Sequence, residues 1–371
     1  MIVMKEKLFF LSILLLLIAF SSSCTRLGRF VFYNFADIKD YKKFPKRELN
    51  KSQAPFHFAE AVVAKEPTIT WNGASMPLED VLEKNKTVAF LIIRNDTILY
   101  EKYLNKYDTA SIVPSFSMAK SVTSMLIGCA IEDGLINSAE EPVSNYIPEL
   151  KKNGFDSVKI KHLLQMTAGI KFNEGYFNPF GHVATFYYGL HLRKNAQKLK
   201  LERAPGTEFR YVSGETQLLG LILENVLAGK TITTYLQEKI WTPLGMEYDA
   251  SWSIDQKKNG IEKTFCCLNA RARDFAKLGR LYLNKGNWNG QQLIPEQWVE
   301  TSTKVDREEG SSPYYQYQWW MTTLKGDYMA QGILGQYIYV NPAKNIVIVR
   351  LGKNYGNASW RSIFVGLAKA L

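Results

Sequence analysis

The residues of this sequence with the clearest chemistry are Ser117 and Lys120, which lie three positions apart in the tetrapeptide Ser-Met-Ala-Lys. If the segment is helical, that spacing puts both side chains on one face. A lysine held beside a serine hydroxyl in a dry pocket can lose its own proton and then accept the proton of the serine. The serine becomes a nucleophile able to attack an ester or amide carbonyl. The pair therefore predicts the chemistry of a serine acyl-hydrolase.

The neighbouring sequence favours a helix that begins at Ser117. An apolar run at residues 89–94 and a second strand-like run at 97–100 precede it, and Asp133-Gly134 ends the apolar periodicity that follows it. At the start of a helix, Ser117 meets the positive end of the helix dipole, where developing negative charge is stabilised. The same residues also allow an ordinary core helix with a solvent-facing serine and lysine, because about one or two such motifs are expected by chance in a chain this long.

The elements around this helix predict an α/β (α+β) domain. Strands occur toward both ends of the chain, and the stretch of about residues 159–245 is mainly helical. This order predicts one sheet built from both ends of the chain, flanked by helices, with a helical subdomain inserted between them. The helices are expected at 160–166, 216–228, 232–240, 270–284, from Pro295 onward and at 360–371, and the late strands at 328–330, 336–340 and 346–351.

Composition excludes several classes of protein. The chain has 371 residues, of which 46% are hydrophobic and 22% are charged, as in an ordinary globular protein. The net charge of +11 is scattered rather than arranged as a basic stripe with aromatics, so we expect no nucleic-acid partner. The histidines and cysteines show no metal-ligand spacing, and we expect no metal and no cofactor. Cys129 is expected to be a buried small hydrophobe. Cys266 and Cys267 could form a vicinal disulfide, but we expect two reduced, half-buried thiols.

The N-terminus predicts export and lipidation. Lys5 and Lys7 precede a thirteen-residue apolar stretch at 8–20, which is too short for a comfortable membrane span, and three serines then lead to Cys24. We interpret residues 1–23 as a lipoprotein signal peptide and Cys24 as the lipidated residue. A plain secretory signal or an N-terminal anchor helix are the alternatives. The prediction places the protein on a bacterial cell envelope, anchored to the membrane by lipid, with its body periplasmic or extracellular.

The domain boundaries follow from the same reading. Residues 24–60 mix basic, aromatic and proline residues, which we interpret as a tether with a short segment packed on the body. Residues 61–371 then form the hydrolase domain, with the helical subdomain at about 159–245.

A second group of residues carries a family resemblance. Tyr211 follows a Pro205-Gly206 turn, and stretches at 163–170, 269–279 and 289–295 accompany it in order. Together with Ser117, this set resembles the serine β-lactamase and penicillin-binding-protein superfamily. The nearest branch contains class C β-lactamases, serine esterases, D-amino peptidases and 6-aminohexanoate-dimer hydrolase. The resemblance covers about residues 85–365 and implies a β-lactamase-like fold with an antiparallel sheet.

The resemblance also implies roles for individual residues. The phenol of Tyr211 is implied to lie beside Ser117 and Lys120, while Ser213 takes the place of the usual asparagine. The strand bordering the site in this family carries Lys-Thr-Gly or His-x-Gly, which here falls on Ala330-Gln331-Gly332, so the cation is gone. Family geometry implies an oxyanion hole formed by the backbone N–H groups of Ser117 and Ile333. Substrate contacts are implied for Ser213, Gln331, Gly332 and Gly335.

These residues predict a serine hydrolase that cleaves an ester or amide through an acyl-enzyme, of the esterase, amidase or D-amino peptidase type. Ser117, Lys120 and Tyr211 are the expected catalytic residues, and the substrate is a small molecule or peptide. Two alternatives stay open at this point. One is an envelope lipoprotein with little or no activity that binds or senses peptidoglycan, which the lost cation and asparagine favour. The other is a β-lactamase, which the lost cation disfavours.

Overall fold

The computed structural model describes Arg29, Tyr33 and residues 35–62, 66–71 and 73–371. The predicted signal peptide and the predicted lipidation at Cys24 therefore lie outside the described residues. Within the described part of the chain, every helix is too short or too polar to cross a membrane.

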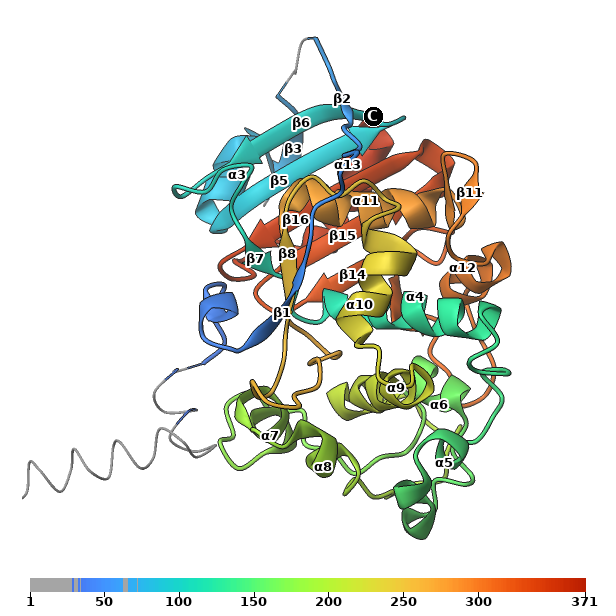
Figure 1. Ribbon diagram of the computed structural model, residues 1–371. Coiled ribbons are helices and arrows are strands. Elements are labelled where there is room, and N and C mark those ends of the chain that lie inside the picture. Colours follow the sequence, from blue (N-terminus) through green and yellow to red (C-terminus); the bar gives the residue numbers. More distant parts are fainter. Residues whose placement is uncertain (1–28, 30–32, 34, 63–65, 72) are drawn as a thin grey trace, which may run out of the picture.

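The main sheet is built from both ends of the described chain, as the sequence predicts (Figure 1). Strand β16 near the C-terminus pairs with β5 from the first third of the chain, and all neighbours are antiparallel except β2 and β6. The strand order is β12-β13-β14-β15-β16-β5-β6-β2. Their bounds are β2 (Ala59–Glu60), β5 (Thr87–Arg94), β6 (Thr97–Tyr103), β12 (Tyr315–Gln316), β13 (Trp319–Met321), β14 (Tyr328–Gly332), β15 (Gln336–Asn341) and β16 (Ile346–Gly352).

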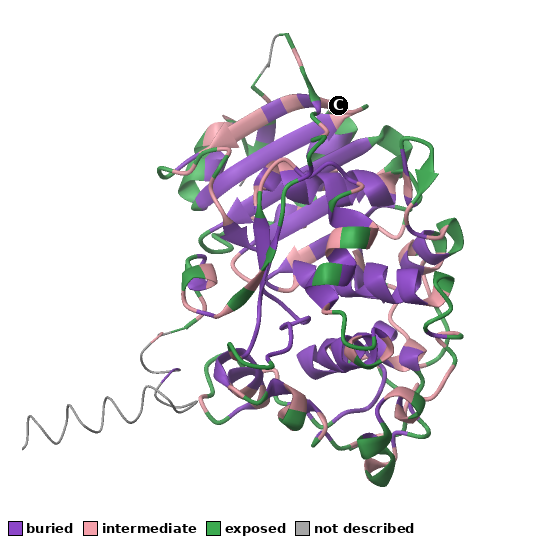
Figure 2. Ribbon diagram, viewed as in Figure 1, coloured by how far each residue is buried: buried purple, intermediate pink, exposed green. Residues whose placement is uncertain are grey.

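Helices cover both faces of this sheet. Helix α11 (Ala272–Leu283) lies on one face against β16 and β15, while α3 (Leu78–Lys84) and α13 (Trp360–Ala370) share a core with the other face. Because successive side chains of a strand point to opposite faces, a strand covered on both sides must be apolar throughout. Strand β5 is buried along its length apart from its last residue, and Figure 2 shows the central strands buried.

Helix α4 (Met118–Glu132) lies between the sheet and the helical part, packing on α9 (Ser213–Val226) and β14 (Figure 1). Residues 118–130 of α4 are all buried, so this is a central helix rather than an amphipathic surface helix. The other helices are α5 (Val143–Tyr146), η2 (Pro148–Asn153), α6 (Ile160–Gln165), α7 (His182–Tyr188), α8 (Leu192–Ala196), α10 (Ile232–Leu236), the π-helical turn η3 (Gln237–Trp241) and α12 (Glu296–Thr303).

A second sheet joins the N-terminal extension to the segment that precedes α4. Its order is β1-β8-β9-β7, with β1 (Lys46–Leu49), β8 (Ala250–Ser253), β9 (Leu268–Ala270) and β7 (Val113–Pro114), all antiparallel. The remaining short elements are the hairpins β3 (Thr68–Trp71) with β4 (Ala74–Pro77) and β10 (Asn287–Trp288) with β11 (Gln291–Gln292), and the 3-10 turns η1 (Asp40–Lys42) and η4 (Pro342–Lys344). Ile38 and Phe44 of the extension are buried in the main core.

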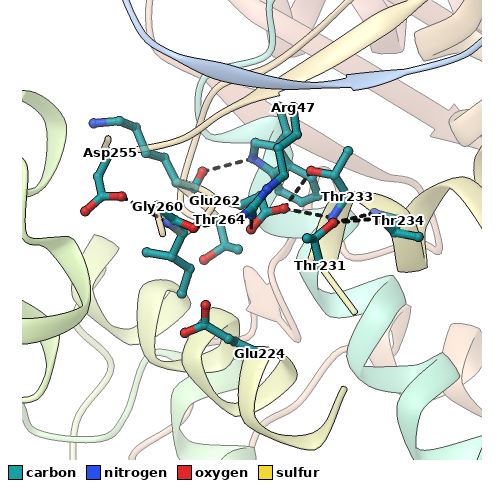
Figure 3. Close-up of polar contacts among 12 residues, drawn as sticks. Arg47, Glu224, Thr231, Thr233, Thr234, Asp255, Gly260, Glu262 and Thr264 are labelled. Atoms are coloured by element: carbon teal, nitrogen blue, oxygen red, sulfur yellow. Dashed lines mark hydrogen bonds and ion pairs between the residues drawn. The ribbon is translucent and has the colours of Figure 1, made fainter. Parts of the chain in front are cut away.

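A buried carboxylate links β1 to the helical part of the molecule through an ion pair and hydrogen bonds. Glu262 is 1% exposed and lies 2.6 Å from the guanidinium of Arg47 on β1. It also accepts hydrogen bonds from the backbone N–H and the hydroxyl of Thr233, at 2.9 and 2.7 Å. Figure 3 shows Arg47 and Thr233 converging on Glu262 from two different elements. The fully partnered carboxylate thus ties the extension to α10.

Candidate active site

The turn before α4 presents Ser117 to a cavity. Phe116 adopts φ +44°, a left-handed conformation that is unusual for a bulky residue, and Ser117 follows at the helix start. Gly332 on β14 packs directly on this turn. A Cβ at that position would lie 2.4 Å from the carbonyl oxygen of Ser115 and 3.1 Å from the backbone nitrogen of Ser117. Only glycine allows the strand to approach the turn before α4 this closely.

Lys120 lies beside Ser117, as the spacing predicts. Its Nζ is 3.1 Å from Ser117 Oγ, 3.1 Å from Ser213 Oγ and 2.8 Å from the carbonyl oxygen of Phe265. The side chain is buried, and burial lowers the pKa of Lys120 to about 8, against an opposing influence from the nearby Glu174 carboxylate. A substantial fraction of this lysine is therefore neutral in mildly alkaline solution, which a base acting on Ser117 requires.

Tyr211 completes the group that the sequence predicts. Its hydroxyl lies close enough to the Ser117 side chain for that side chain to lower the pKa of the phenol slightly, and Lys120 Nζ lies 5.0 Å from the centre of its ring. Burial of the phenol raises the pKa of Tyr211 far above its usual value, and the Glu174 charge raises that pKa further. The phenol therefore keeps its proton at neutral pH and can donate a hydrogen bond.

No sequence motif points to Glu174, which lies in the loop before α7. Its carboxylate accepts a hydrogen bond from Ser213 Oγ at 2.6 Å and another from the Ser213 backbone N–H at 2.8 Å. No motif connects a loop glutamate to a serine 39 positions away, so only the three-dimensional fold reveals the contact. Because the Ser213 hydroxyl proton points to Glu174, the Ser213 oxygen faces Lys120 as an acceptor.

The other predicted residues divide into two groups. Ile333 lines the same cavity as Ser117 and Ser213, and Gln331 and Gly332 belong to the adjoining strand β14. Gly335 contacts Arg350 instead. It adopts φ +80°, and its carbonyl oxygen accepts a 2.6 Å hydrogen bond from the Arg350 guanidinium. A Cβ at position 335 would lie 1.9 Å from the same guanidinium. The position of the family cation is taken by Ala330, which is 1% exposed.

The expectation for the adjacent cysteines is wrong. Cys266 and Cys267 form a vicinal disulfide with a Cα–Cα distance of 3.8 Å, and their exposures are 4% and 3% instead of half. Cys267 adopts φ +72°, a local turn that the order of residues does not indicate. The bridge lies at the site, since Cys266 lines the cavity and the preceding carbonyl, that of Phe265, contacts Lys120. Cys129 is free and buried, as expected.

The cavity in front of Ser117 has a volume of about 310 Å³ and a mainly aromatic wall. Its polar side chains near the reacting group are Ser117 and Ser213. Among the described residues, no group of three or more His, Cys, Asp or Glu side chains is arranged to hold a metal ion. The aromatic residues of the lining are Phe35, Phe116, Tyr176, Phe177, Tyr187, Tyr188, Phe265 and Tyr355.

Comparisons with known proteins show what the chain is similar to. A family model described as Beta-lactamase matches residues 78–362. The chain is 30% identical over 300 residues to the 6-aminohexanoate-dimer hydrolase of Paenarthrobacter ureafaciens, and the match covers 74% of each chain. A solved candidate 6-aminohexanoate-dimer hydrolase from Bacillus anthracis is similar with a TM-score of 0.80 and 26% identity, covering 92% of this chain and 94% of that one. A class C beta-lactamase in complex with cefoxitin shares the fold, with a TM-score of 0.57, 17% identity and coverage of 79% and 95%.

Proposed function

The chain belongs to the beta-lactamase family and is a serine hydrolase, and we propose that it cleaves an ester or amide bond through an acyl-enzyme formed on Ser117. The observation that carries this proposal is the buried Lys120 ammonium, which lies 3.1 Å from Ser117 Oγ with a lowered pKa. The resemblance drawn from the motifs and the predicted fold are both confirmed by the family match and the similar structures.

The first step is proton transfer from Ser117 to Lys120. A neutral lysine has two N–H donors and one lone pair, and two acceptors besides Ser117 surround Nζ, namely Ser213 Oγ and the Phe265 carbonyl. With both donors occupied there, the lone pair faces Ser117 Oγ. Ser117 then attacks the substrate carbonyl carbon, and the backbone N–H groups of Ser117 and Ile333 stabilise the oxyanion.

The second step breaks the bond to the leaving group. The raised pKa of Tyr211 supports a role as the proton donor to the leaving oxygen or nitrogen. Lys120 then returns to Tyr211 the proton that it took from Ser117. In deacylation, water loses a proton to the Lys120–Tyr211 pair and attacks the acyl carbon, and Ser117 regains its proton as the acid product leaves. The two groups share protons throughout, so neither is the only base.

The substrate class includes amides as well as esters. The relative from Paenarthrobacter ureafaciens is named for the hydrolysis of a 6-aminohexanoate dimer, which supports amide cleavage as one activity of this chain. A β-lactam is a poorer candidate, because Ala330 leaves the bordering strand without the cation that would hold a carboxylate. A role limited to binding peptidoglycan is also disfavoured, because Ser117, Lys120 and Tyr211 are retained together and lie side by side.

We further propose that the protein is an envelope lipoprotein anchored through Cys24, with its hydrolase body on the periplasmic or extracellular side. This proposal rests on the sequence of the N-terminus alone.

Labelling of Ser117 tests the proposed function. A fluorophosphonate should add its mass to the wild-type protein and to a Ser157→Ala control, whose substituted serine is exposed and remote from the cavity. Ser117→Ala should be neither labelled nor able to hydrolyse p-nitrophenyl acetate, while it keeps the wild-type circular dichroism spectrum. Equal labelling of Ser117→Ala and wild type would contradict the proposal. In the same preparation, turnover of a chromogenic cephalosporin should be weak or absent.

A further inference from the structure

We propose that the substrate carries an uncharged, apolar chain that lies in the cavity beside Ser117, an inference that rests on the proposed function. The observation behind it is the composition of the wall. Among the described residues that line the cavity, none has an ionisable acid, lysine, arginine or histidine side chain. Away from Ser117 and Ser213, the wall consists of aromatic and aliphatic groups such as Val183, Ala184 and Leu334.

Two of the four tyrosines of the wall have hydroxyls that are bound to carboxylates. Tyr187 donates its hydroxyl proton to Asp40 at 2.7 Å, and Tyr176 donates to Glu174 at 3.2 Å. These hydroxyls are directed to carboxylates, so their rings form the apolar surface. The Glu174 carboxylate itself accepts hydrogen bonds from Ser213 as well. A charged group on the substrate would therefore lose its hydration in the cavity without gaining a partner of opposite charge.

The rim of the cavity extends this apolar path. Phe177 is 79% exposed and Phe35 is 46% exposed, although both line the cavity, and their rings meet edge to face at 5.3 Å. Phe180, on the same loop as Phe177, is 70% exposed. Clustered exposed aromatic rings beside a concave site are typical of a binding surface for apolar ligands. A chain that outgrows the cavity can therefore continue against these rings.

The wall also has a consequence for chain length. Each methylene buried from water contributes about a fourfold gain in binding. Two further methylenes that enter the cavity should therefore raise kcat/KM by about fifteenfold. A methylene series of p-nitrophenyl esters should show this rise until the chain passes the rim.

Isosteric pairs of esters test the inference. p-Nitrophenyl heptanoate and p-nitrophenyl 6-aminohexanoate differ only in a terminal methyl against an ammonium group, and hexyl acetate and 5-aminopentyl acetate make the same comparison on the alcohol side. In at least one pair, kcat/KM should favour the uncharged ester by about a hundredfold. Ratios near one in both pairs would overturn the inference. If hydrolysis is observed but does not depend on Ser117, the proposed function fails instead.

Two further measurements keep the inference falsifiable. Calorimetry of methyl heptanoate and methyl 6-aminohexanoate binding to Ser117→Ala measures the same preference without turnover. The alcohol-side pair is measured in the same way. Equal affinities within both pairs would overturn the inference. Leu334→Asp places a charge in the wall at φ +63°, a left-handed conformation that Asp and Asn tolerate. In that variant the ratio of kcat/KM for the ammonium ester to kcat/KM for the uncharged ester should be at least about tenfold higher than in the uncharged control, Leu334→Asn. An unchanged preference in Leu334→Asp would also count against the inference.

Discussion

The carboxylate of Glu174 accepts two hydrogen bonds from Ser213, one from its hydroxyl at 2.6 Å and one from its backbone N–H at 2.8 Å. This pair occupies the place where the superfamily resemblance implies a single asparagine. Ser213 alone could rotate its hydroxyl proton toward Lys120 and compete for the lysine lone pair. Glu174 removes that freedom, so Ser213 offers Lys120 an oxygen acceptor. Glu174 is therefore a positioning residue that acts through Ser213.

Glu174→Gln should change the pH dependence of activity. Since Lys120 must be neutral, wild-type kcat/KM should rise as the pH increases through about 8. The Glu174 charge favours the ammonium form and raises the pKa of Lys120, so its removal should move the rising limb to lower pH. The plateau should also fall, because the amide holds Ser213 less firmly. The measurement is a kcat/KM profile from pH 6 to 10.

Glu300→Gln serves as the matched control, because Glu300 is half exposed and pairs with Lys285 on the surface. Its profile should coincide with that of the wild type. If Glu174→Gln lowers the plateau without moving the limb, the carboxylate has a structural role only.

Tyr211→Phe should reduce turnover by about a hundredfold or more, the usual effect of losing a general acid. The loss should be greater for an alkyl ester than for a p-nitrophenyl ester, since p-nitrophenolate leaves without a proton. Lys120→Ala should lower kcat for both esters about equally, because Lys120 accepts the proton of the nucleophile Ser117 and not that of the leaving group. The comparison needs kcat for both ester types, with the exposed Tyr314→Phe as control. Equal losses on both esters in Tyr211→Phe would refute the proposed proton donation.

Parts of the fold with strong local signals could be predicted from the sequence. The apolar run of β5 and the tight turn at Asn95-Asp96, both at positive φ, gave the first hairpin, and apolar periodicity gave α4. The Ser117–Lys120 contact follows from helical spacing, while Tyr211 needed the family pattern.

Other features depend on contacts that a linear pattern does not contain. Strand β1 has four residues, only one of them buried, and becomes a strand by pairing with β8, which lies about 200 positions later. Glu174 reaches Ser213 from an irregular loop. The resemblance implies a substrate contact at Gly335, but the side of that backbone with no room for a Cβ faces Arg350 rather than the cavity. The pairing of Cys266 with Cys267 depends on a left-handed turn.

Lipidation of Cys24 is a separate prediction, because the N-terminal segment lies outside the described residues. The mature protein should begin at Cys24 and carry an added acyl mass, since lipid attachment precedes removal of the signal peptide. Mass spectrometry of the N-terminal peptide from membranes measures this directly. A Cys24→Ala variant should accumulate as the larger precursor. An intact Met1, or a cut elsewhere without lipid, would refute the prediction.

Arg47→Ala should destabilise the protein by about 2 kcal/mol, less than the 3–5 kcal/mol typical of a fully buried pair because Arg47 is 27% exposed. The loss arises because Glu262, at 1% exposure, loses its partner on β1 and is left as a buried carboxyl group with fewer polar contacts. Lys46→Ala is the matched control on the same strand, since Lys46 pairs with Glu48 in solvent and should cost less than about 0.5 kcal/mol.

Urea denaturation measures both free energies of unfolding through the midpoint at a constant slope. Adding Glu262→Gln to Arg47→Ala should cost less than the sum of the two single changes, because the second change removes the charge that the first left unpaired. If the two effects are additive, the Arg47–Glu262 ion pair contributes no interaction free energy, and β1 is held only by its pairing with β8.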